Sequence, residues 1–208
     1  MNAAIQITSD TLVPTEPGTP FEGGFYVGKF RIGDEHFALI IAPKDVGEPA
    51  NDLAWGKYGT EISGADSFND GRANTEAMLA AELPLATWIK GLVINGFSDW
   101  YIPSRDELEL IYRHLKPVEG ENYTYRNGEN PSALPPTHAY TLALPGQTHS
   151  AEFKDGGSQA MEERWYWSST QYSAHTAWGQ SFDVGSQVSV GKDGEGRARA
   201  VRRFKLSA

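Results

Sequence analysis

The sequence predicts an α+β fold with a small twisted antiparallel sheet, two or three helices and long irregular loops. Three observations support this prediction. A capped amphipathic helix is expected from Ser104 to Leu115, and short strands with glycine-containing turns are expected from Trp165 onward. Between them, residues 117–163 contain five prolines and no periodic run of apolar residues. The chain has 208 residues, 39% of them hydrophobic, and no cysteine. A chain of this length can bury a core without disulfide bonds.

The domain organisation follows from the same composition. Residues 1–22 are rich in Thr, Pro, Glu and Ser, and they are expected to form an extended arm that orders against a neighbouring subunit. Residues 23–208 are predicted to form one domain, with residues 117–163 as a loop-rich insertion. Long irregular loops inside a domain tend to be functional or mobile, so the insertion is a place where a site could lie.

The first half of the chain is expected to contain one hairpin and three helices. A Gly33-Asp34 turn joins the predicted strands Phe25–Ile32 and His36–Ala42, and residues 44–71 are expected to be loop. Capping residues and apolar periodicity define the helices. The predicted helices are Asn74–Ala81, with Asn74 as its cap, Pro84–Leu92, and Ser104–Leu115, with a capping box made by Ser104 and Glu107.

The last quarter of the chain is expected to form an antiparallel meander. Its predicted strands are Trp165–Ser169, Ala174–Phe182, Gln187–Val190 and Ala198–Phe204. Six basic and two acidic residues lie between Lys192 and Lys205, whereas the net charge of the chain is −9. A basic terminal strand in an acidic body favours internal ion pairs over contacts with phosphate, and nucleic-acid binding is not expected.

No motif indicates catalysis. The segment Gly179–Asp183 approaches a nucleophile elbow, but its second glycine is replaced and a strand is expected to follow. The segment Asp66–Gly71 resembles a calcium loop, yet Phe68 offers no oxygen, which favours a turn held by Asp and Asn side chains. We therefore expect no catalytic residue, no metal and no cofactor. One alternative is an enzyme site in the insertion, around His138 and His149.

Aromatic and neutral polar side chains alternate in the C-terminal part, from Tyr166 to Tyr172 and from Trp178 to Asp183. Such surfaces suit the recognition of sugars or proteins, because rings contribute contact area and amides orient the ligand. We expect the tryptophans at 165, 167 and 178 to be core residues. The polar side chains expected to be exposed are Gln180, Ser186, Gln187 and Ser189.

Three motifs resemble a known family. The segment Gly96–Leu108 (Gly-Phe-Ser-Asp-Trp-Tyr-Ile-Pro-Ser-Arg-Asp-Glu-Leu) resembles a signature of the Lcl C-terminal domain family. The stretch Tyr166–Thr170 (Tyr-Trp-Ser-Ser-Thr), followed by the arginines of Arg197–Phe204, is similar to the closing segment of that family. Asp70–Thr75 is similar to a third element. The resemblance covers roughly residues 50–205.

This resemblance implies a C-type-lectin-like fold related to the formylglycine-generating enzymes. Relatives occur in bacterial surface proteins, phages and prophages, and some are variable proteins of diversity-generating retroelements that bind ligands through a diversified C-terminal surface. The calcium-dependent lectin motifs and the cysteines of the formylglycine-generating enzymes are missing here. The residues expected to bind ligand are Tyr172, His175, Thr176, Trp178, Gln180, Asp183, Ser186, Gln187 and Ser189, with Ser181 and Val184 in the same segment.

The expected function is recognition. No apolar run is long enough to span a membrane, and the first 20 residues lack a secretory signal, so we expect synthesis in a bacterial cytoplasm and release in a virion. The leading hypothesis is a phage or prophage tail-associated protein that binds a host-surface receptor, either a protein or a glycan. Its expected partners are other virion subunits, contacted through the arm, and further copies of itself, for example in a trimer. The alternative is a purely structural virion subunit, such as a decoration or baseplate protein.

Overall fold

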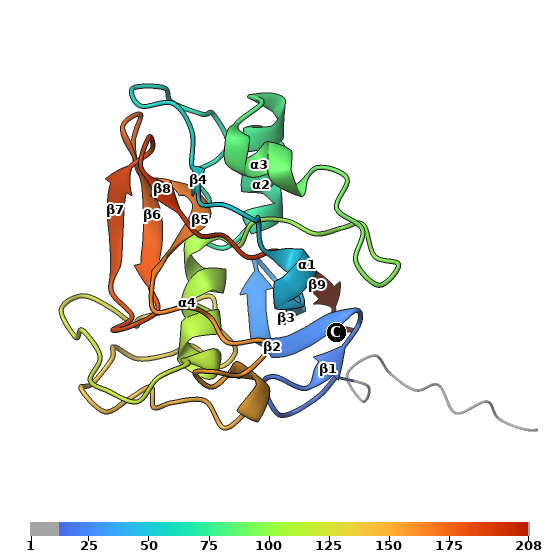
Figure 1. The fold of residues 1–208 in the computed structure, drawn as a ribbon, viewed down its shortest axis with the longest axis vertical. Helices are drawn as coiled ribbons and strands as arrows, with labels where there is room; N and C mark the ends of the chain where they lie inside the picture. Colours follow the sequence, from blue (N-terminus) through green and yellow to red (C-terminus); the bar gives the residue numbers. More distant parts are fainter. Residues whose placement is uncertain (1–12, 208) are drawn as a thin grey trace, which may run out of the picture.

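The chain folds around helix α4 (Arg105–Leu115), which lies between an N-terminal and a C-terminal sheet (Figure 1). The computed structural model describes residues 13–207. The predicted capping box is present at the start of α4, because Ser104 Oγ accepts a hydrogen bond from Glu107 N and the Glu107 carboxylate accepts one from Ser104 N. The apolar face of the helix is buried, as its periodicity predicts.

The remaining elements alternate between short helices and strands. The helices are α1 (Lys44–Gly47), α2 (Gly71–Ala80), α3 (Pro84–Ile89) and the 3-10 helix η2 (Ala151–Phe153). The strands are β1 (Pro20–Phe21), β2 (Gly24–Ile32), β3 (Glu35–Ile41), β4 (Leu53–Ala54), β5 (Trp165–Gln171), β6 (Thr176–Ser181), β7 (Gln187–Gly191), β8 (Glu195–Gly196) and β9 (Val201–Lys205). These elements confirm the predicted α+β class. No helix in the described part of the chain has the length and hydrophobicity of a membrane span.

The strands form three small antiparallel sheets. The N-terminal sheet has the order β1-β2-β3-β9, the C-terminal sheet has the order β5-β6-β7, and β4 pairs with β8 between them. The hairpin predicted around Gly33 is confirmed as β2 and β3, with Phe30 opposite Phe37. The predicted four-stranded meander is wrong in its last strand. After β8 the chain crosses to the other sheet, where β9 pairs with β3 from Val201 opposite Ile41 onward.

Arginine–carboxylate pairs hold this crossing segment in place. Arg202 Nε lies 2.8 Å from Asp99 Oδ1, and one Arg203 nitrogen lies 2.7 Å from Asp70 Oδ1. These carboxylates belong to the N-terminal half of the domain, which explains why the last strand leaves the meander. The predicted internal ion pairs are therefore confirmed.

Two further arginines of the same segment meet Glu48, which follows α1. Arg197 lies 2.7 Å from this carboxylate, and Arg199 lies 3.7 Å from it. Arg199 is fully buried and donates hydrogen bonds to the carbonyl oxygens of Ala42 and Gln159. Burial lowers the pKa of the Arg199 guanidinium to about 10, so the group is still protonated at neutral pH.

The bounds of α2 and α3 differ from those predicted. Helix α2 begins at Gly71 because the Asp70 carboxylate accepts from Ala73 N, so Asp70 is the cap. The Asn74 side chain lies inside the helix and accepts from Ser67 N. These side chains form the turn expected in the calcium-like segment. Helix α3 ends at Ile89, not at residue 92, because the chain turns at Gly91, which has a positive φ of 78°.

The ends of the predicted arm and insertion are also visible. Residues 1–12 of the arm lie outside the described residues, but β1 pairs with β2, so the end of the predicted arm belongs to the sheet. The insertion, residues 117–163, is irregular apart from η2 and isolated bridges. It borders the C-terminal sheet, where Tyr123 N donates to Val184 O and Gln187 N donates to Asn127 Oδ1.

The Glu107 carboxylate is buried where α2, α4 and the segment before α4 meet. Its Oε2 accepts from Ser104 N at 2.7 Å and from Gly71 N at 3.1 Å, and its Oε1 accepts from the Tyr101 hydroxyl at 2.6 Å. A Cβ at position 71 would lie 2.4 Å from Oε2, so only glycine fits there. Burial raises the pKa of Glu107 from its usual 4.5 to about 7, although these three donors favour the ionised form.

The raised pKa predicts that Glu107 makes stability depend on pH. Because the folded protein holds this proton more tightly than the unfolded chain, stability falls as pH rises from about 4.5 to about 7 and then levels off. The Glu107→Gln variant retains a neutral side chain at every pH. The free energy of unfolding of the wild type, measured against that of the variant by urea denaturation, should decrease by about 2–3 kcal/mol between pH 5 and pH 8. If the difference in the free energy of unfolding between wild type and variant stayed constant over this range, the raised pKa of Glu107 would be contradicted.

Candidate ligand-binding groove

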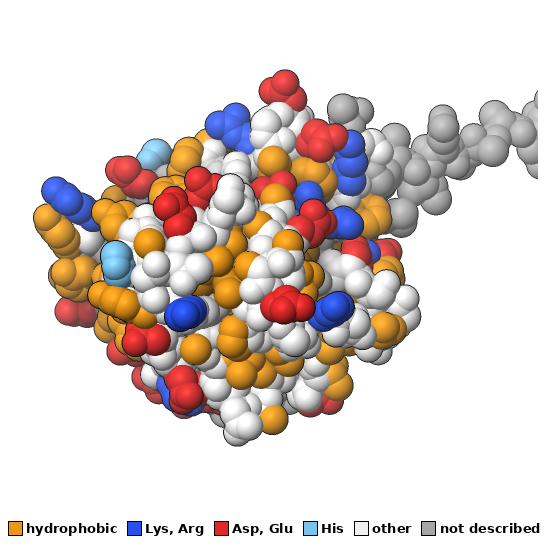
Figure 2. All heavy atoms as spheres, turned by 90° about the horizontal axis from the view of Figure 1, so that it is seen from above, with side chains coloured by type: hydrophobic (Ala, Val, Ile, Leu, Met, Phe, Trp, Pro, Cys, Tyr) orange, Lys and Arg blue, Asp and Glu red, His pale blue; other side chains and the backbone are white. Residues whose placement is uncertain are grey.

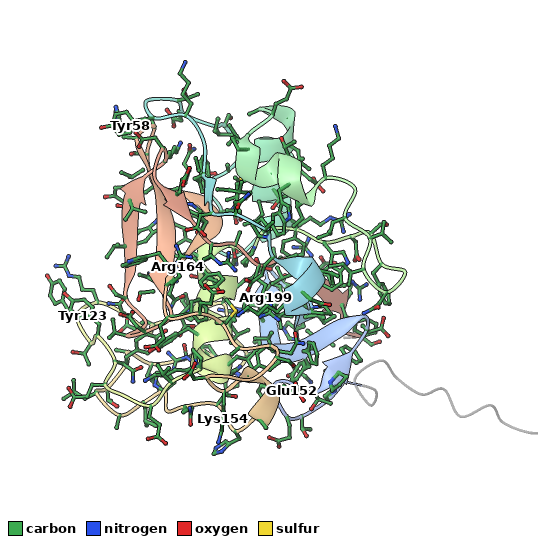
Figure 3. All side chains as sticks on the ribbon, in the orientation of Figure 1. Tyr58, Tyr123, Glu152, Lys154, Arg164 and Arg199 are labelled. Atoms are coloured by element: carbon green, nitrogen blue, oxygen red, sulfur yellow. The ribbon has the colours of Figure 1, made fainter. Side chains whose placement is uncertain are left out.

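A groove lies between the C-terminal sheet and the insertion. It has a volume of about 390 Å³. We call it the aromatic groove, and it is lined by Arg105, Tyr123, Tyr125, Arg126, Asn127, Tyr172, Trp178, Gln187, Val188 and Ser189. Three of its tyrosines are largely exposed, at 48% for Tyr123 and 63% for both Tyr125 and Tyr172. Figure 3 shows Tyr123 at the outer margin of the insertion, beside this sheet.

The groove has a layered wall of rings and a cation. The Arg105 guanidinium, at the start of α4, lies 4.7 Å from the Trp178 ring and 5.0 Å from the Phe68 ring. Tyr172 packs edge-to-face on Trp178, with a centroid distance of 5.5 Å. Arg105 also contacts the Asp106 carboxylate at 3.3 Å. The wall therefore presents an exposed tyrosine on a tryptophan that a cation holds in place.

Two N–H groups in this wall have no hydrogen-bond acceptor among the described residues. They are Arg105 Nε and Trp178 Nε1, and both atoms are buried. Ring and cation contacts, together with the Arg105–Asp106 pair, therefore hold the layer together. A wall built mainly from flat stacked surfaces offers contact area to a ligand and few fixed polar directions.

Two glutamines form the floor of the groove. Gln187 Nε2 donates to Arg105 O at 2.8 Å and to Gln180 Oε1 at 3.1 Å. Gln180 Nε2 donates in turn to Gly185 O and to the Tyr140 hydroxyl. The expectation that these glutamines are exposed is wrong, since Gln180 is 0% and Gln187 is 9% exposed. Their amides hold the insertion and the β6–β7 turn together, so Gln180 supports the groove from beneath.

The structure brings together only some of the residues expected to bind ligand. Tyr172, Trp178, Gln187 and Ser189 line the groove. The others lie away from it, at the two ends of the sheet or within it.

At one end of the sheet, the exposed His175 packs against Tyr58 with a centroid distance of 4.8 Å, and Thr176 bonds to Ser173. Figure 3 shows Tyr58 at the end of the sheet opposite Tyr123.

At the other end, the exposed Asp183 accepts from Val184 N in the β6–β7 turn. Ser186 is half-buried, and its carbonyl oxygen accepts from the buried Ser181. The expectation that Ser186 and Ser189 are exposed is met only in part, because both are half-buried.

Sequence reasoning missed six of the ten residues that line the groove. Arg105 stands in the family-like motif Gly96–Leu108, and no role was expected for it from the sequence. The tyrosines at 123 and 125 and the adjacent Arg126 lie in the insertion, in the run Asn122–Asn127. Two tyrosines and an arginine in a segment without periodicity are the signal that could have identified them, because nothing there predicts a buried face.

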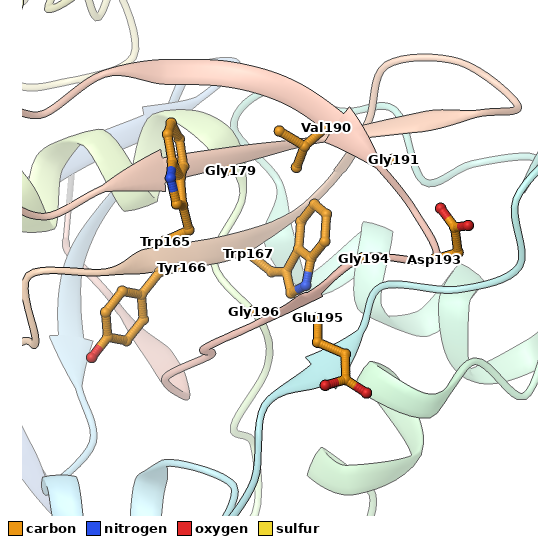
Figure 4. A pocket seen from close by; sticks show the side chains of 10 residues that line it. All are labelled: Trp165, Tyr166, Trp167, Gly179, Val190, Gly191, Asp193, Gly194, Glu195 and Gly196. Atoms are coloured by element: carbon orange, nitrogen blue, oxygen red, sulfur yellow. The ribbon is translucent and has the colours of Figure 1, made fainter.

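A second, smaller cavity of about 280 Å³ lies on the opposite face of the C-terminal sheet (Figure 4). Trp165 and Trp167 project into it from β5, on either side of Gly179. Trp165 was expected in the core, but it is 41% exposed because glycines at positions 179, 194 and 196 leave the space beside it open. Trp167 is buried and donates to Leu53 O, as a core residue, whereas Trp178 is half-buried.

The surface does not concentrate charge of one sign on the face seen in Figure 2, where acidic, basic and apolar side chains are interspersed. Within residues 13–207, no group of three or more His, Cys, Asp or Glu side chains is arranged to hold a metal ion. His138 and His149 are both exposed in the insertion, and neither lines the aromatic groove.

The fold and this groove define the class of protein as an α+β domain whose terminal sheet and loop insertion together border a surface groove. Residues 46–202 match the family model described as the Lcl C-terminal domain, so the chain belongs to that family. The resemblance found in the sequence motifs is therefore confirmed. No curated protein matches the chain significantly.

The floor of the groove generates a prediction on stability. Gln180→Ala removes a buried amide, leaves the Gly185 carbonyl oxygen without its donor and takes away one of the two acceptors of Gln187 Nε2, which should lower the free energy of unfolding by about 1–3 kcal/mol. Ser189→Ala, on the neighbouring strand, should change it by less than about 0.5 kcal/mol. Urea denaturation of both variants tests this, and equal stabilities would show that Gln180 does not support the floor.

Proposed function

We propose that this protein is a non-enzymatic recognition protein that binds its ligand in the aromatic groove. The observation that carries the proposal is the exposed aromatic surface of Tyr125 and Tyr172, each 63% exposed in the lining of the groove, where Tyr172 packs on the supported Trp178 ring. Exposed aromatic side chains that border a groove are typical of binding sites, since they contribute area at a low cost in side-chain entropy. The buried glutamine floor keeps the groove in shape before a ligand arrives.

The proposed biological setting is a phage or prophage virion, in which the protein is tail-associated and recognises a receptor on the host surface. This part rests on the resemblance to phage and prophage relatives. The receptor is a protein or a glycan, and both chemistries suit a groove that combines rings, amides and arginine side chains. The N-terminal arm is proposed to contact neighbouring virion subunits, and several copies in one particle would strengthen weak single sites.

Two other functions remain as alternatives. A purely structural virion subunit would use the same fold without a ligand. An enzyme would require the insertion histidines, and replacing both His138 and His149 without loss of function would exclude that possibility.

We predict that the protein binds host cells through the aromatic groove. The assay adds fluorescently labelled protein to intact cells of a panel of bacterial strains. The protein should bind saturably to the strain that carries the receptor. Tyr172→Ala and Tyr125→Ala should each weaken this binding by about tenfold or more, because truncation of a central aromatic residue typically costs that much.

Tyr58→Ala is the matched control, since Tyr58 is similarly exposed, at 56%, but lies at the opposite end of the sheet (Figure 3). It should bind as the wild type does. An equal loss of binding in all three variants would argue against the groove as the binding site. Binding to no strain, together with assembly into particles, would favour the structural alternative.

A further inference from the structure

The outer edge of strand β7 carries backbone groups that no other strand covers within the described residues. Strand β7 is the last strand of the order β5-β6-β7. Such an edge is a template for pairing with another chain unless it is protected.

The hydrogen bonds next to β7 show which of its groups face outward. Ser181 N donates to Ser186 O, and Lys192 N donates to His175 O, both at 3.0 Å. In an antiparallel ladder the hydrogen-bonded pairs alternate, so residues 188 and 190 bond to β6 and residues 187, 189 and 191 point away from it. The contact of Gln187 N with Asn127 Oδ1 in the insertion agrees with this assignment.

Four of the outward groups are available for pairing. They are the N–H and C=O of Ser189, the N–H of Gly191 and the C=O of Gln187. The two other outward groups are already bonded within the chain, because Gln187 N donates to Asn127 and Gly191 O accepts from Gly194 N. The edge therefore offers a matched set of donors and acceptors centred on Ser189.

Nothing in the sequence of β7 protects this edge. The strand reads Gln-Val-Ser-Val-Gly, without a charged residue or a proline, and its register with β6 contains no bulge. Lysine, proline and bulges are the usual devices that prevent edge pairing. Val188 is 37% exposed on the strand. The edge is thus flat, uncharged and partly apolar.

The charges at the two ends of β7 are of opposite sign. Arg126 lies beside Asn127, which bonds to Gln187 at the start of the strand, and Asp193 lies just beyond Gly191 at its end. Both side chains are exposed, and neither has an ion-pair partner in the described part of the chain. An antiparallel copy of the same strand would bring each of these charges towards its opposite.

We propose that β7 pairs with β7 of a second copy of this chain around a twofold axis at Ser189. Gln187 then lies opposite Gly191 of the second copy, and Val188 lies opposite Val190 of that copy. The two C-terminal sheets become one continuous six-stranded sheet, and Arg126 of each copy approaches Asp193 of the other. Such an interface is isologous and closed, so it produces a dimer.

The backbone part of the proposal is tested by Ser189→Pro. Proline removes only the outward N–H and is tolerated on an edge strand, so pairing with β6 should persist. Ser189→Ala is the control that loses the hydroxyl and retains the N–H. In sedimentation velocity from about 10 µM to about 1 mM, the wild type and Ser189→Ala should show a reversible dimer, and Ser189→Pro should weaken it about tenfold or more.

The proposed attraction between Arg126 and Asp193 is tested independently by substitutions at these two exposed residues. This test remains valid if Ser189→Pro fails to fold. Asp193→Arg should weaken the dimer, and the double variant Arg126→Asp with Asp193→Arg should restore it, because both charges are then reversed. A wild type that stays monomeric over this range would overturn the proposal. A dimer that neither Ser189→Pro nor Asp193→Arg weakens, or an oligomer other than a dimer, would overturn it as well.

Discussion

The buried carboxylate of Glu107 joins three parts of the chain whose relative position determines the rest of the structure. It receives N–H groups from the starts of α2 and α4 and the hydroxyl of Tyr101. Tyr101 also forms a backbone bridge with Val201 at the start of β9. The two helices and the last strand are therefore tied to one point. Both carboxylate oxygens are engaged there, so each of these segments constrains the others.

The sequence predicted the parts of the fold that local chemistry determines. The capping box at Ser104 and the hairpin at Gly33 follow from side chains and turn residues that act over a few positions, and both are present. The path of the last strand could not be predicted in this way. It depends on ion pairs between Arg202 or Arg203 and carboxylates more than a hundred positions earlier, and periodicity carries no information on such partners.

The same distinction between local chemistry and long-range contacts applies to the groove. Exposed rings such as Tyr172 could be identified on the terminal strands, but strand alternation suggested that Gln180 was exposed. Its burial results from the insertion, which covers that face and places Tyr140 against its amide. The insertion residues that line the groove lie in a segment without regular structure. Their position follows from contacts such as that between Asn127 and Gln187, which are visible only in three dimensions.

The pairing of β9 with β3 has a consequence for the order in which the molecule folds. Strand β3 is synthesised early, but its outer neighbour ends at Lys205. The N-terminal sheet is therefore incomplete while the ribosome is still translating the C-terminal sheet, and the outer edge of β3 has no neighbouring strand until residues more than 150 positions later are made. The N-terminal sheet can be completed only after β9 has been synthesised, and a chain that stops before Val201 would lack both a strand and the arginines that meet Asp70 and Asp99.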